Sequence, residues 1–183
     1  MTAPHRRIAL VLGGARSGKS AVAERLIARW AADSPITYVA TATLDGADAA
    51  LAERVERHVD RRHHSGLTWR VVEAPLDLPG LLRSVDGPVL LDALGPWVAS
   101  TWGHDVDCRD LAAALTERHG DTVVVSDEVG LSIHPATEMG RWFVDRVGET
   151  NNAVATVADP VWLCVAGRVV VLPGADEAFR DLT

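Results

Sequence analysis

The segment Gly13–Ser20 restricts the fold of this 183-residue chain more than any other part of it. Its sequence, GGARSGKS, satisfies the pattern G-x-x-x-x-G-K-[ST], in which the backbone of a glycine-rich turn cradles phosphate groups. The apolar run Ile8–Leu12 precedes this motif, and the helix-forming run Ala21–Ile27 follows it. A strand that leads through such a turn into a helix directs backbone N–H groups and the positive helix end at one point. The sequence therefore predicts a phosphate-binding loop, or P-loop, between a buried strand and a helix.

Individual residues of the P-loop have separate expected roles. Gly13 and Gly18 allow the backbone to approach phosphate groups closely, because they carry no side chain. Lys19 is expected to reach the β- and γ-phosphates of a nucleotide, and the hydroxyl of Ser20 is expected to bind Mg²⁺. Lys19 is also expected to face solvent in the empty protein, so that its truncation costs little stability.

Charge and composition exclude several classes of partner. The net charge is −7 and the isoelectric point is near 5.4, whereas nucleic acids and acidic membranes select basic surfaces. No apolar run approaches the roughly 20 residues of a membrane span, and the polar segment 1–7 does not resemble a secretory leader. Cys108 and Cys164 are far apart in the sequence, which is typical of a reduced protein. We expect a cytoplasmic protein with no nucleic-acid partner and no membrane span.

Strand-like and helix-like segments alternate along most of the chain, which predicts a single α/β domain over residues 1–183. The strand-like segments are Ile8–Leu12, Ile36–Ala40, Trp69–Glu73, Val89–Asp92, Thr122–Asp127, Val161–Ala166 and Arg168–Leu172. The helix-like segments are Gly18–Ala32, Ala47–Arg62, Leu111–His119 and Thr137–Val147. Most strands are continuous apolar runs, as in a parallel sheet that is covered on both faces. Because only Gly167 separates the last two strands, they are expected to form an antiparallel hairpin at an edge.

The segment from residue 51 to residue 62 is highly charged, and on a helix its side chains separate into three stripes. Apolar, acidic and basic residues each form one stripe, and His58 lies at the border between the basic and apolar stripes. Neighbouring arginines disfavour the imidazolium form, which keeps the ring neutral and nucleophilic near pH 7. The pattern by itself is also compatible with a solvated helix that carries a surface histidine.

Together, these motifs resemble the adenosylcobinamide kinase/adenosylcobinamide-phosphate guanylyltransferase family of the late cobalamin pathway. The resemblance spans almost the whole chain. It is carried by Gly13–Ser20, Ile36–Ala42, the R-x-x-x-H-x-x-x-R frame Arg54–Arg62, Trp69-Arg70, Glu128–Gly130, Pro135, Arg141–Phe143, Asp145, Gly148, Asn151 and Val165–Gly167.

This resemblance implies a fold, two activities and an assembly. The implied fold is a RecA-like P-loop NTPase domain with a mostly parallel central sheet. One implied activity phosphorylates a hydroxyl of adenosylcobinamide with ATP or GTP in the presence of Mg²⁺, and the sequence leaves the choice of nucleotide open. The other transfers GMP from GTP onto that phosphate, which gives adenosylcobinamide-GDP and pyrophosphate. The family also implies a homotrimer.

The resemblance also assigns site residues. The histidine that carries GMP in the family corresponds to His58. The nucleotide-contacting positions correspond to Gly13, Gly14, Ala15, Arg16, Ser17, Gly18, Lys19, Ser20, Ala40, Thr41, Ala42, Val59, Asp60, Arg61, Arg62, Glu73 and Asp92. A competing hypothesis is a single-activity P-loop kinase for another small hydroxylated metabolite, with His58 inert, and a second is a non-catalytic nucleotide-binding subunit.

Two positions depart from the family and leave the Mg²⁺ carboxylate open. Asp92 stands where the family often has Glu, and Asp127 stands where it frequently has Asn. A carboxylate that ends a buried parallel strand beside a P-loop is a usual Mg²⁺ ligand, which favours Asp92. Asp127 and Glu128 remain alternatives, and Glu128 could instead be a structural hydrogen-bond acceptor at a strand end.

Several histidines and tryptophans remain weaker candidates. His63 and His64 are expected in an exposed loop, because the sequence offers no metal-ligating partners at suitable spacing. The loop residues His104 and His134 are either unremarkable surface histidines or part of the corrinoid site. Trp97 and Trp102 flank a segment after Asp92 that could meet a large ligand, although packing is the alternative. The remaining tryptophans that we expect to pack in the core are Trp30, Trp69, Trp142 and Trp162.

Overall fold

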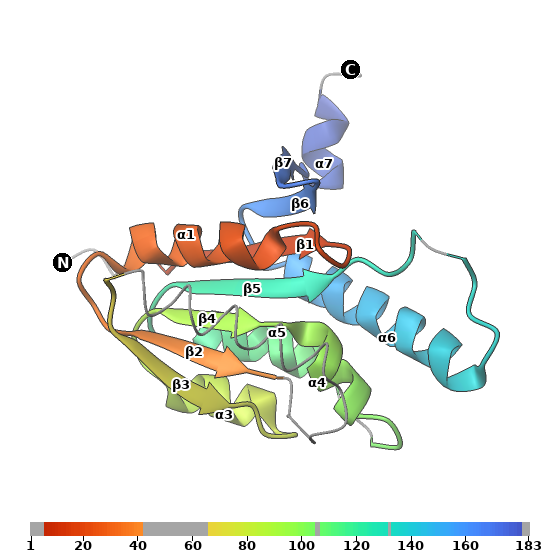
Figure 1. Ribbon diagram of the computed structural model, residues 1–183, viewed down its shortest axis with the longest axis horizontal. Coiled ribbons are helices and arrows are strands. Elements are labelled where there is room, and N and C mark those ends of the chain that lie inside the picture. Colours follow the sequence, from red (N-terminus) through yellow and green to blue (C-terminus); the bar gives the residue numbers. More distant parts are fainter. Residues whose placement is uncertain (1–5, 42–65, 105–106, 132, 181–183) are drawn as a thin grey trace.

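The computed structural model describes residues 6–41, 66–104, 107–131 and 133–180 (Figure 1). Its strands are β1 (Ile8–Gly13), β2 (Ile36–Ala40), β3 (Trp69–Glu73), β4 (Val89–Asp92), β5 (Thr122–Asp127), β6 (Val161–Val165) and β7 (Arg168–Val171). Its helices are α1 (Lys19–Ala31), α3 (Leu78–Ser84), α4 (Leu94–Ser100), α5 (Cys108–Glu117), α6 (Glu138–Ala155) and α7 (Ala175–Ala178). The predicted helix Ala47–Arg62 lies outside the described residues.

The strands form one seven-stranded sheet in the order β3-β2-β4-β5-β1-β6-β7. Every neighbouring pair is parallel except β6 and β7, which pair antiparallel. The predicted mostly parallel sheet with a C-terminal antiparallel edge hairpin is therefore confirmed. The turn of that hairpin contains Ala166 as well as Gly167, and both have positive φ, of 50° and 74°. Since β5 lies between the P-loop strand β1 and strand β4, the arrangement agrees with the expected RecA-like fold.

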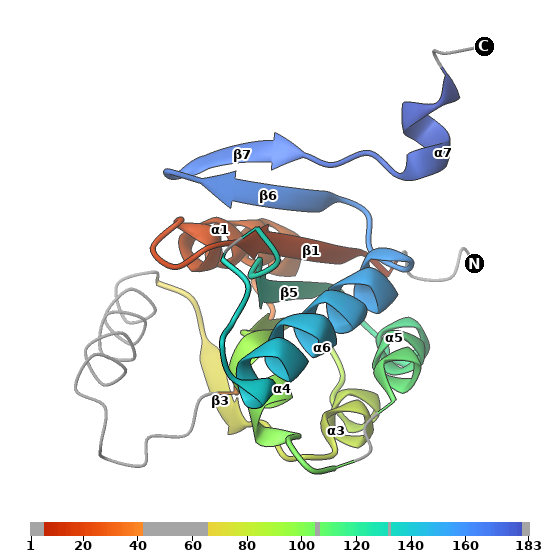
Figure 2. The same cartoon turned by 90° about the vertical axis from the view of Figure 1, so that its right-hand side faces the viewer.

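Side chains of the central strands alternate between two separate hydrophobic cores. Leu10 and Leu12 of β1 face a core that is completed by α3, α4, α5 and α6. Ala9 and Val11 face the opposite core, which is closed by α1. Figures 1 and 2 show this division, with α1 on one side of the sheet and the other large helices across it. Burial on both faces explains why these strands read as unbroken apolar runs.

Of the four predicted helices, the three that fall on described residues are present with shifted ends, and three short helices, α3, α4 and α7, were missed. The last predicted helix, Thr137–Val147, continues to Ala155. Helices α3 and α4 have the sequences LPGLLRS and LGPWVAS, which contain glycine and proline and are only seven residues long. In α3 the side chain of Asp77 caps the first turn by accepting a hydrogen bond from Gly80 N at 2.9 Å. Caps and packing, rather than intrinsic propensity, stabilise such short helices.

A buried arginine joins the two turns that precede β4 and β5. These turns lie at the amino ends of the strands, opposite to the P-loop. Arg118, which is only 2% exposed, follows α5. Its guanidinium donates to the carbonyl oxygens of Val85 and Gly87, at 3.1 and 2.5 Å, just before β4. It also donates to Gly120 O at 2.8 Å and to Thr122 Oγ1 at 2.5 Å, at the start of β5. Burial lowers the pKa of Arg118 to about 10, so the side chain is still charged at neutral pH.

We predict that Arg118→Met destabilises the fold by about 3 kcal/mol or more, because several buried oxygens lose their donor. Arg118→Lys should recover only part of this loss, since an ammonium lacks the planar fork that reaches both turns. Urea denaturation measures the effect. Arg83→Ala is the control, because Arg83 pairs with Asp110 and Glu117 at the surface and its loss should change stability little. A small effect of Arg118→Met would contradict this assignment.

Candidate active site

The P-loop connects the end of β1 to the start of α1, as the motif predicts. Gly18 directly precedes α1 with a φ of 93°, a left-handed conformation that favours glycine. Gly13 is enclosed, since a Cβ atom there would lie 2.5 Å from Ser17 Oγ and 2.8 Å from Cys164 O. The backbone conformation therefore requires a glycine at position 18, and close packing within the loop requires one at position 13.

The β6–β7 hairpin supports the P-loop from one side. Gly167, in the turn of the hairpin, donates its N–H to Ser17 O at 2.9 Å. A Cβ atom on Gly18 would lie 3.2 Å from the Cα atom of Gly167, so the two backbones are in contact. Cys164 of β6 is also buried here. Its burial raises the pKa of its thiol, and the nearby charge of Lys19 offsets only part of this rise. The loop is thus held by the edge hairpin as well as by β1 and α1.

Lys19 is buried and ion-paired, contrary to the expectation that it faces solvent. Its side chain is only 4% exposed, and Nζ lies 2.9 Å from Asp127 Oδ1. Nζ also donates a hydrogen bond to Gly14 O at 3.1 Å. The expectation was wrong because β5 is the neighbour of β1, which places Asp127 opposite Gly13 in the register. Truncation of Lys19 would therefore leave a carboxylate without this partner.

Ser20 and Asp92 meet beside the P-loop. The Ser20 hydroxyl donates to Asp92 Oδ1 at 3.2 Å, and the Tyr38 hydroxyl donates to Asp92 Oδ2 at 3.0 Å. Asp92 ends β4 and is 6% exposed. A carboxylate and a hydroxyl at the first turn of a P-loop helix are oxygen donors of the kind that Mg²⁺ prefers. The residues present therefore fit the predicted metal.

The two alternative metal carboxylates have other partners. Asp127 forms the ion pair with Lys19. Glu128 Oε1 accepts a hydrogen bond from Gly130 N at 2.9 Å, which is the structural role considered as its alternative. Of the three carboxylates, Asp92 is the one with a hydrogen bond to Ser20. The geometry thus favours Asp92 as the metal-binding residue.

Strand register brings three further predicted positions together. Ala40, at the end of β2, is paired with Glu73 of β3 on one side and with Asp92 of β4 on the other. Glu73 is exposed. Thr41 follows directly and is buried, and its hydroxyl donates to Ala93 O and accepts from Ala93 N. Thr41 therefore holds the chain that follows Asp92, a role that the sequence did not indicate.

Comparison with known proteins identifies the family. A model of the family described as cobinamide kinase / cobinamide phosphate guanyltransferase matches residues 9–172. The bifunctional adenosylcobalamin biosynthesis protein CobP of Pseudomonas aeruginosa is 36% identical over 174 residues, which cover 90% of this chain and 96% of that protein. The corresponding protein CobU of Salmonella typhimurium is 33% identical over 181 residues, covering 86% of this chain and 95% of that protein.

The chain belongs to the cobinamide kinase / cobinamide phosphate guanyltransferase family. The family resemblance predicted from the sequence is therefore confirmed. Among solved structures, the flagellar accessory protein FlaH from Methanocaldococcus jannaschii aligns over 92% of this chain and 79% of that chain, at 15% identity and a TM-score of 0.46. No helix in the described part of the chain is both long and apolar enough to cross a membrane.

Several residues assigned by resemblance to this family lie outside the described residues. They are His58, Ala42, Val59, Asp60, Arg61 and Arg62, together with the loop candidates His63 and His64. Their roles stay predictions. The described part of the site comprises the P-loop, the strand ends at Ala40, Glu73, Asp92 and Asp127, and the residues that hold them.

The structure separates the two tryptophans considered for the corrinoid site. Trp97 is 2% exposed, packs in the core and donates its indole N–H to Leu76 O at 3.1 Å, so it is a packing residue. Trp102 is 40% exposed and packs edge-to-face against Trp142, with ring centroids 4.8 Å apart. His104 and His134 are exposed. The tryptophans that pack partly buried against the cores, as predicted, are Trp30, Trp69, Trp142 and Trp162.

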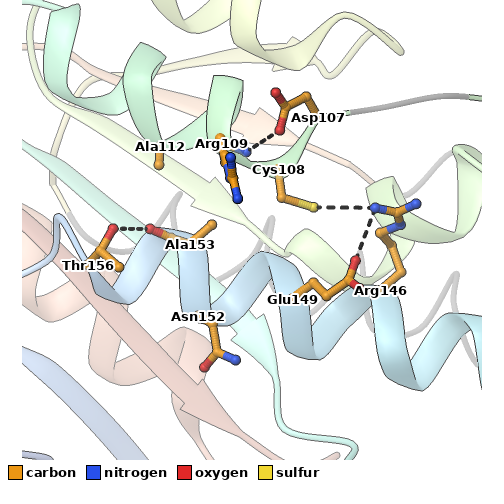
Figure 3. Close-up of a pocket in the computed structure, with 9 residues that line it drawn as sticks. All are labelled: Asp107, Cys108, Arg109, Ala112, Arg146, Glu149, Asn152, Ala153 and Thr156. Atoms are coloured by element: carbon orange, nitrogen blue, oxygen red, sulfur yellow. Dashed lines mark hydrogen bonds and ion pairs between the residues drawn. The ribbon is translucent and has the colours of Figure 1, made fainter. Parts of the chain in front are cut away.

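A groove of about 890 Å³ lies between α5 and α6 (Figure 3). Three of its charged side chains have local partners: Arg146 Nη1 lies 3.1 Å from Glu149 Oε2, and Asp107 Oδ1 accepts from the backbone N–H of Arg109 at 2.8 Å. The lining residues are Asp107, Cys108, Arg109, Ala112, Arg146, Glu149, Asn152, Ala153 and Thr156, none of which belongs to the predicted site. The candidate active site is therefore the P-loop edge of the sheet and not this groove.

Proposed function

We propose that one P-loop, in one catalytic domain, serves both activities of this enzyme. Family membership gives the activities: the protein is a bifunctional cobinamide kinase and cobinamide phosphate guanylyltransferase. The hypotheses of a single-activity kinase and of a non-catalytic subunit are accordingly not favoured. The observation that carries the shared site is the grouping of Lys19, Ser20 and Asp92 at one phosphate-binding loop.

In the kinase step, the P-loop holds the triphosphate of ATP or GTP, and adenosylcobinamide presents its hydroxyl to the γ-phosphorus. The hydroxyl oxygen forms a bond to this phosphorus and releases its proton to solvent, the bond to the oxygen that bridges the β- and γ-phosphates breaks, and the nucleoside diphosphate leaves. Backbone N–H groups of Gly14–Ser20 and the Lys19 ammonium stabilise the phosphate oxygens. Ser20 and Asp92 would hold Mg²⁺, which offsets negative charge on the phosphates when it is bound.

In the guanylyl step, a neutral nitrogen of His58 attacks the α-phosphorus of GTP. A bond from nitrogen to phosphorus forms and the α–β phosphoanhydride bond breaks. The β- and γ-phosphates, which the P-loop holds, become the leaving pyrophosphate. An oxygen of adenosylcobinamide phosphate then displaces His58 from the phosphorus, which gives adenosylcobinamide-GDP. The sequence stripe of Arg54, Arg57 and Arg61 offers positive charge for the transferring group.

The proposed setting is a homo-oligomer, a trimer by family resemblance, in the cytoplasm. The outer strand β7 supports self-association, because Val169, Val170 and Val171 are 41%, 50% and 64% exposed. Such an apolar edge is commonly covered in an assembly. Cys108 and Cys164 are both free thiols, which agrees with a reducing compartment. The acidic net charge of −7 argues against nucleic acid as a partner.

The histidine intermediate has a direct test. His58→Ala should abolish covalent attachment of GMP and transfer of GMP, yet leave the kinase activity largely in place, because only guanylyl transfer needs a nucleophile. The wild-type adduct should carry label from the α-phosphate but not the γ-phosphate of GTP, and it should be acid-labile and stable in base. His63→Ala and His64→Ala are matched controls that should retain the adduct. A base-stable GMP adduct in His58→Ala would exclude this mechanism.

Lys19→Ala should remove both activities, because both use the same phosphate cradle. The loss of kcat/KM should be at least about 100-fold in each reaction, since an ammonium that contacts transferring phosphates stabilises charge in the transition state. The two assays are run on one preparation, with circular dichroism to confirm folding. Near-normal guanylyl transfer by this variant would show that the two reactions do not share the P-loop.

Asp92→Asn should weaken Mg²⁺-dependent turnover more than nucleotide binding. The amide keeps the shape and the hydrogen bond from Ser20 but removes the charge that attracts the cation. Turnover measured across a Mg²⁺ titration should show a half-saturating concentration raised by about tenfold or more. Nucleotide affinity without Mg²⁺ provides the reference. An unchanged Mg²⁺ dependence in Asp92→Asn, with the loss in Glu128→Gln, would move the metal to Glu128.

A further inference from the structure

The P-loop lysine has an anionic partner within the protein. Lys19 Nζ lies 2.9 Å from Asp127 Oδ1 and 3.1 Å from Gly14 O, and the lysine side chain is only 4% exposed. Phosphate oxygens that bind in the loop would interact with the same ammonium group. Because both partners are anions, the carboxylate and the phosphates compete for Lys19.

Asp127 is fixed in place by its surroundings. It ends β5, and its position in the register is opposite Gly13 of the P-loop. Its carbonyl oxygen accepts a hydrogen bond from Asn151 Nδ2 at 3.0 Å, and the following residue, Glu128, donates its N–H to Gly13 O at 3.2 Å. A Cβ atom on Gly95 would lie 2.3 Å from Asp127 Oδ2, so the carboxylate packs against the backbone of α4. The carboxylate therefore cannot follow Lys19 freely when the lysine moves.

The energetic consequence follows from this fixed position. A lysine has a long, flexible stem, so the ammonium can turn from Asp127 to the phosphates. Loss of a largely buried ion pair subtracts from the free energy gained with the phosphates, and the carboxylate also repels them. When the product phosphates leave, the pair with Asp127 is available again. The carboxylate thus favours the empty state of the P-loop over the occupied state.

We propose that Asp127 is a positioning residue that competes with phosphate groups for Lys19 and thereby speeds the release of pyrophosphate and nucleoside diphosphate. The proposal rests on the function given above, in which both products leave from this P-loop. It assigns Asp127 a role different from metal binding. It also explains why a carboxylate is tolerated beside a loop whose ligands are anions.

Asp127→Asn tests the proposal, because the amide has the same shape without the charge. The rate of dissociation of a ribose-labelled fluorescent GDP, measured by stopped flow, should fall by about tenfold. The dissociation constant of inorganic pyrophosphate, measured by calorimetry, should fall by about the same factor, the scale of one charge-assisted hydrogen bond. The matched control is Glu128→Gln, which removes the adjacent carboxylate charge and should leave both quantities close to wild type. Asp127→Ser provides a second uncharged variant if the amide disturbs folding.

A double-mutant cycle shows whether Asp127 acts through Lys19. In a Lys19→Ala background, Asp127→Asn should change pyrophosphate affinity much less than in the wild type. Unchanged or weaker pyrophosphate binding in both uncharged Asp127 variants, or an equal effect of Glu128→Gln, would overturn the proposal. If Lys19→Ala itself left pyrophosphate binding intact, the assigned function of the P-loop would fail instead. The two failures are therefore distinguishable.

Discussion

The parallel pairing of β1 with β5, and of β5 with β4, is the constraint on which the site depends. Parallel strands end at the same edge of a sheet, so Gly13, Asp127 and Asp92 reach that edge together although they are far apart in the sequence. The register then decides the contacts: Asp127 is opposite Gly13 and meets Lys19, whereas Asp92 meets Ser20. A shift of β5 by one residue would turn Asp127 away from the P-loop, because successive side chains of a strand point to opposite faces.

The polar backbone groups at the amino ends and at the carboxyl ends of the strands find their partners in different ways. At the amino ends, the carbonyl oxygens of the turns before β4 and β5 accept hydrogen bonds from the buried guanidinium of Arg118. At the P-loop edge, Ser17 N–H of the glycine-rich turn donates to Gly14 O within the turn, and Ser17 O accepts from Gly167 N in the β6–β7 hairpin. The contacts that stabilise the fold therefore lie at the amino ends of the strands, and the ligand-binding loop lies at their carboxyl ends. This division is common in sheets of this type, in which ligands bind at the carboxyl ends.

The parts of the fold that the sequence predicted are those with a strong local signal. The P-loop is a fixed pattern, and apolar runs such as Val89–Leu91 are long enough to identify buried strands. Helices α3 and α4 were not predicted because their glycine and proline residues obscure a helical period. The sequence left Trp97 open between packing and ligand contact, because nothing local shows that α4 turns it into the core. The burial of Lys19 depended on strand order, which no local pattern contains. For the same reason Asp127 was considered a metal ligand and not the partner of Lys19.

The charges at the P-loop determine which positive groups must accompany a bound nucleotide. Lys19 is neutralised by Asp127, and Asp92 adds a second carboxylate, so these described side chains have no net positive charge. A triphosphate adds several negative charges to this edge. Backbone N–H groups and the start of α1 offset part of that charge, because their dipoles point at the loop. Under the proposed function, a cation beside Asp92 and Ser20 and the basic stripe of Arg54, Arg57 and Arg61 would offset the remaining charge. An acidic P-loop edge is therefore consistent with a site that binds its nucleotide together with Mg²⁺ and does not retain free phosphates.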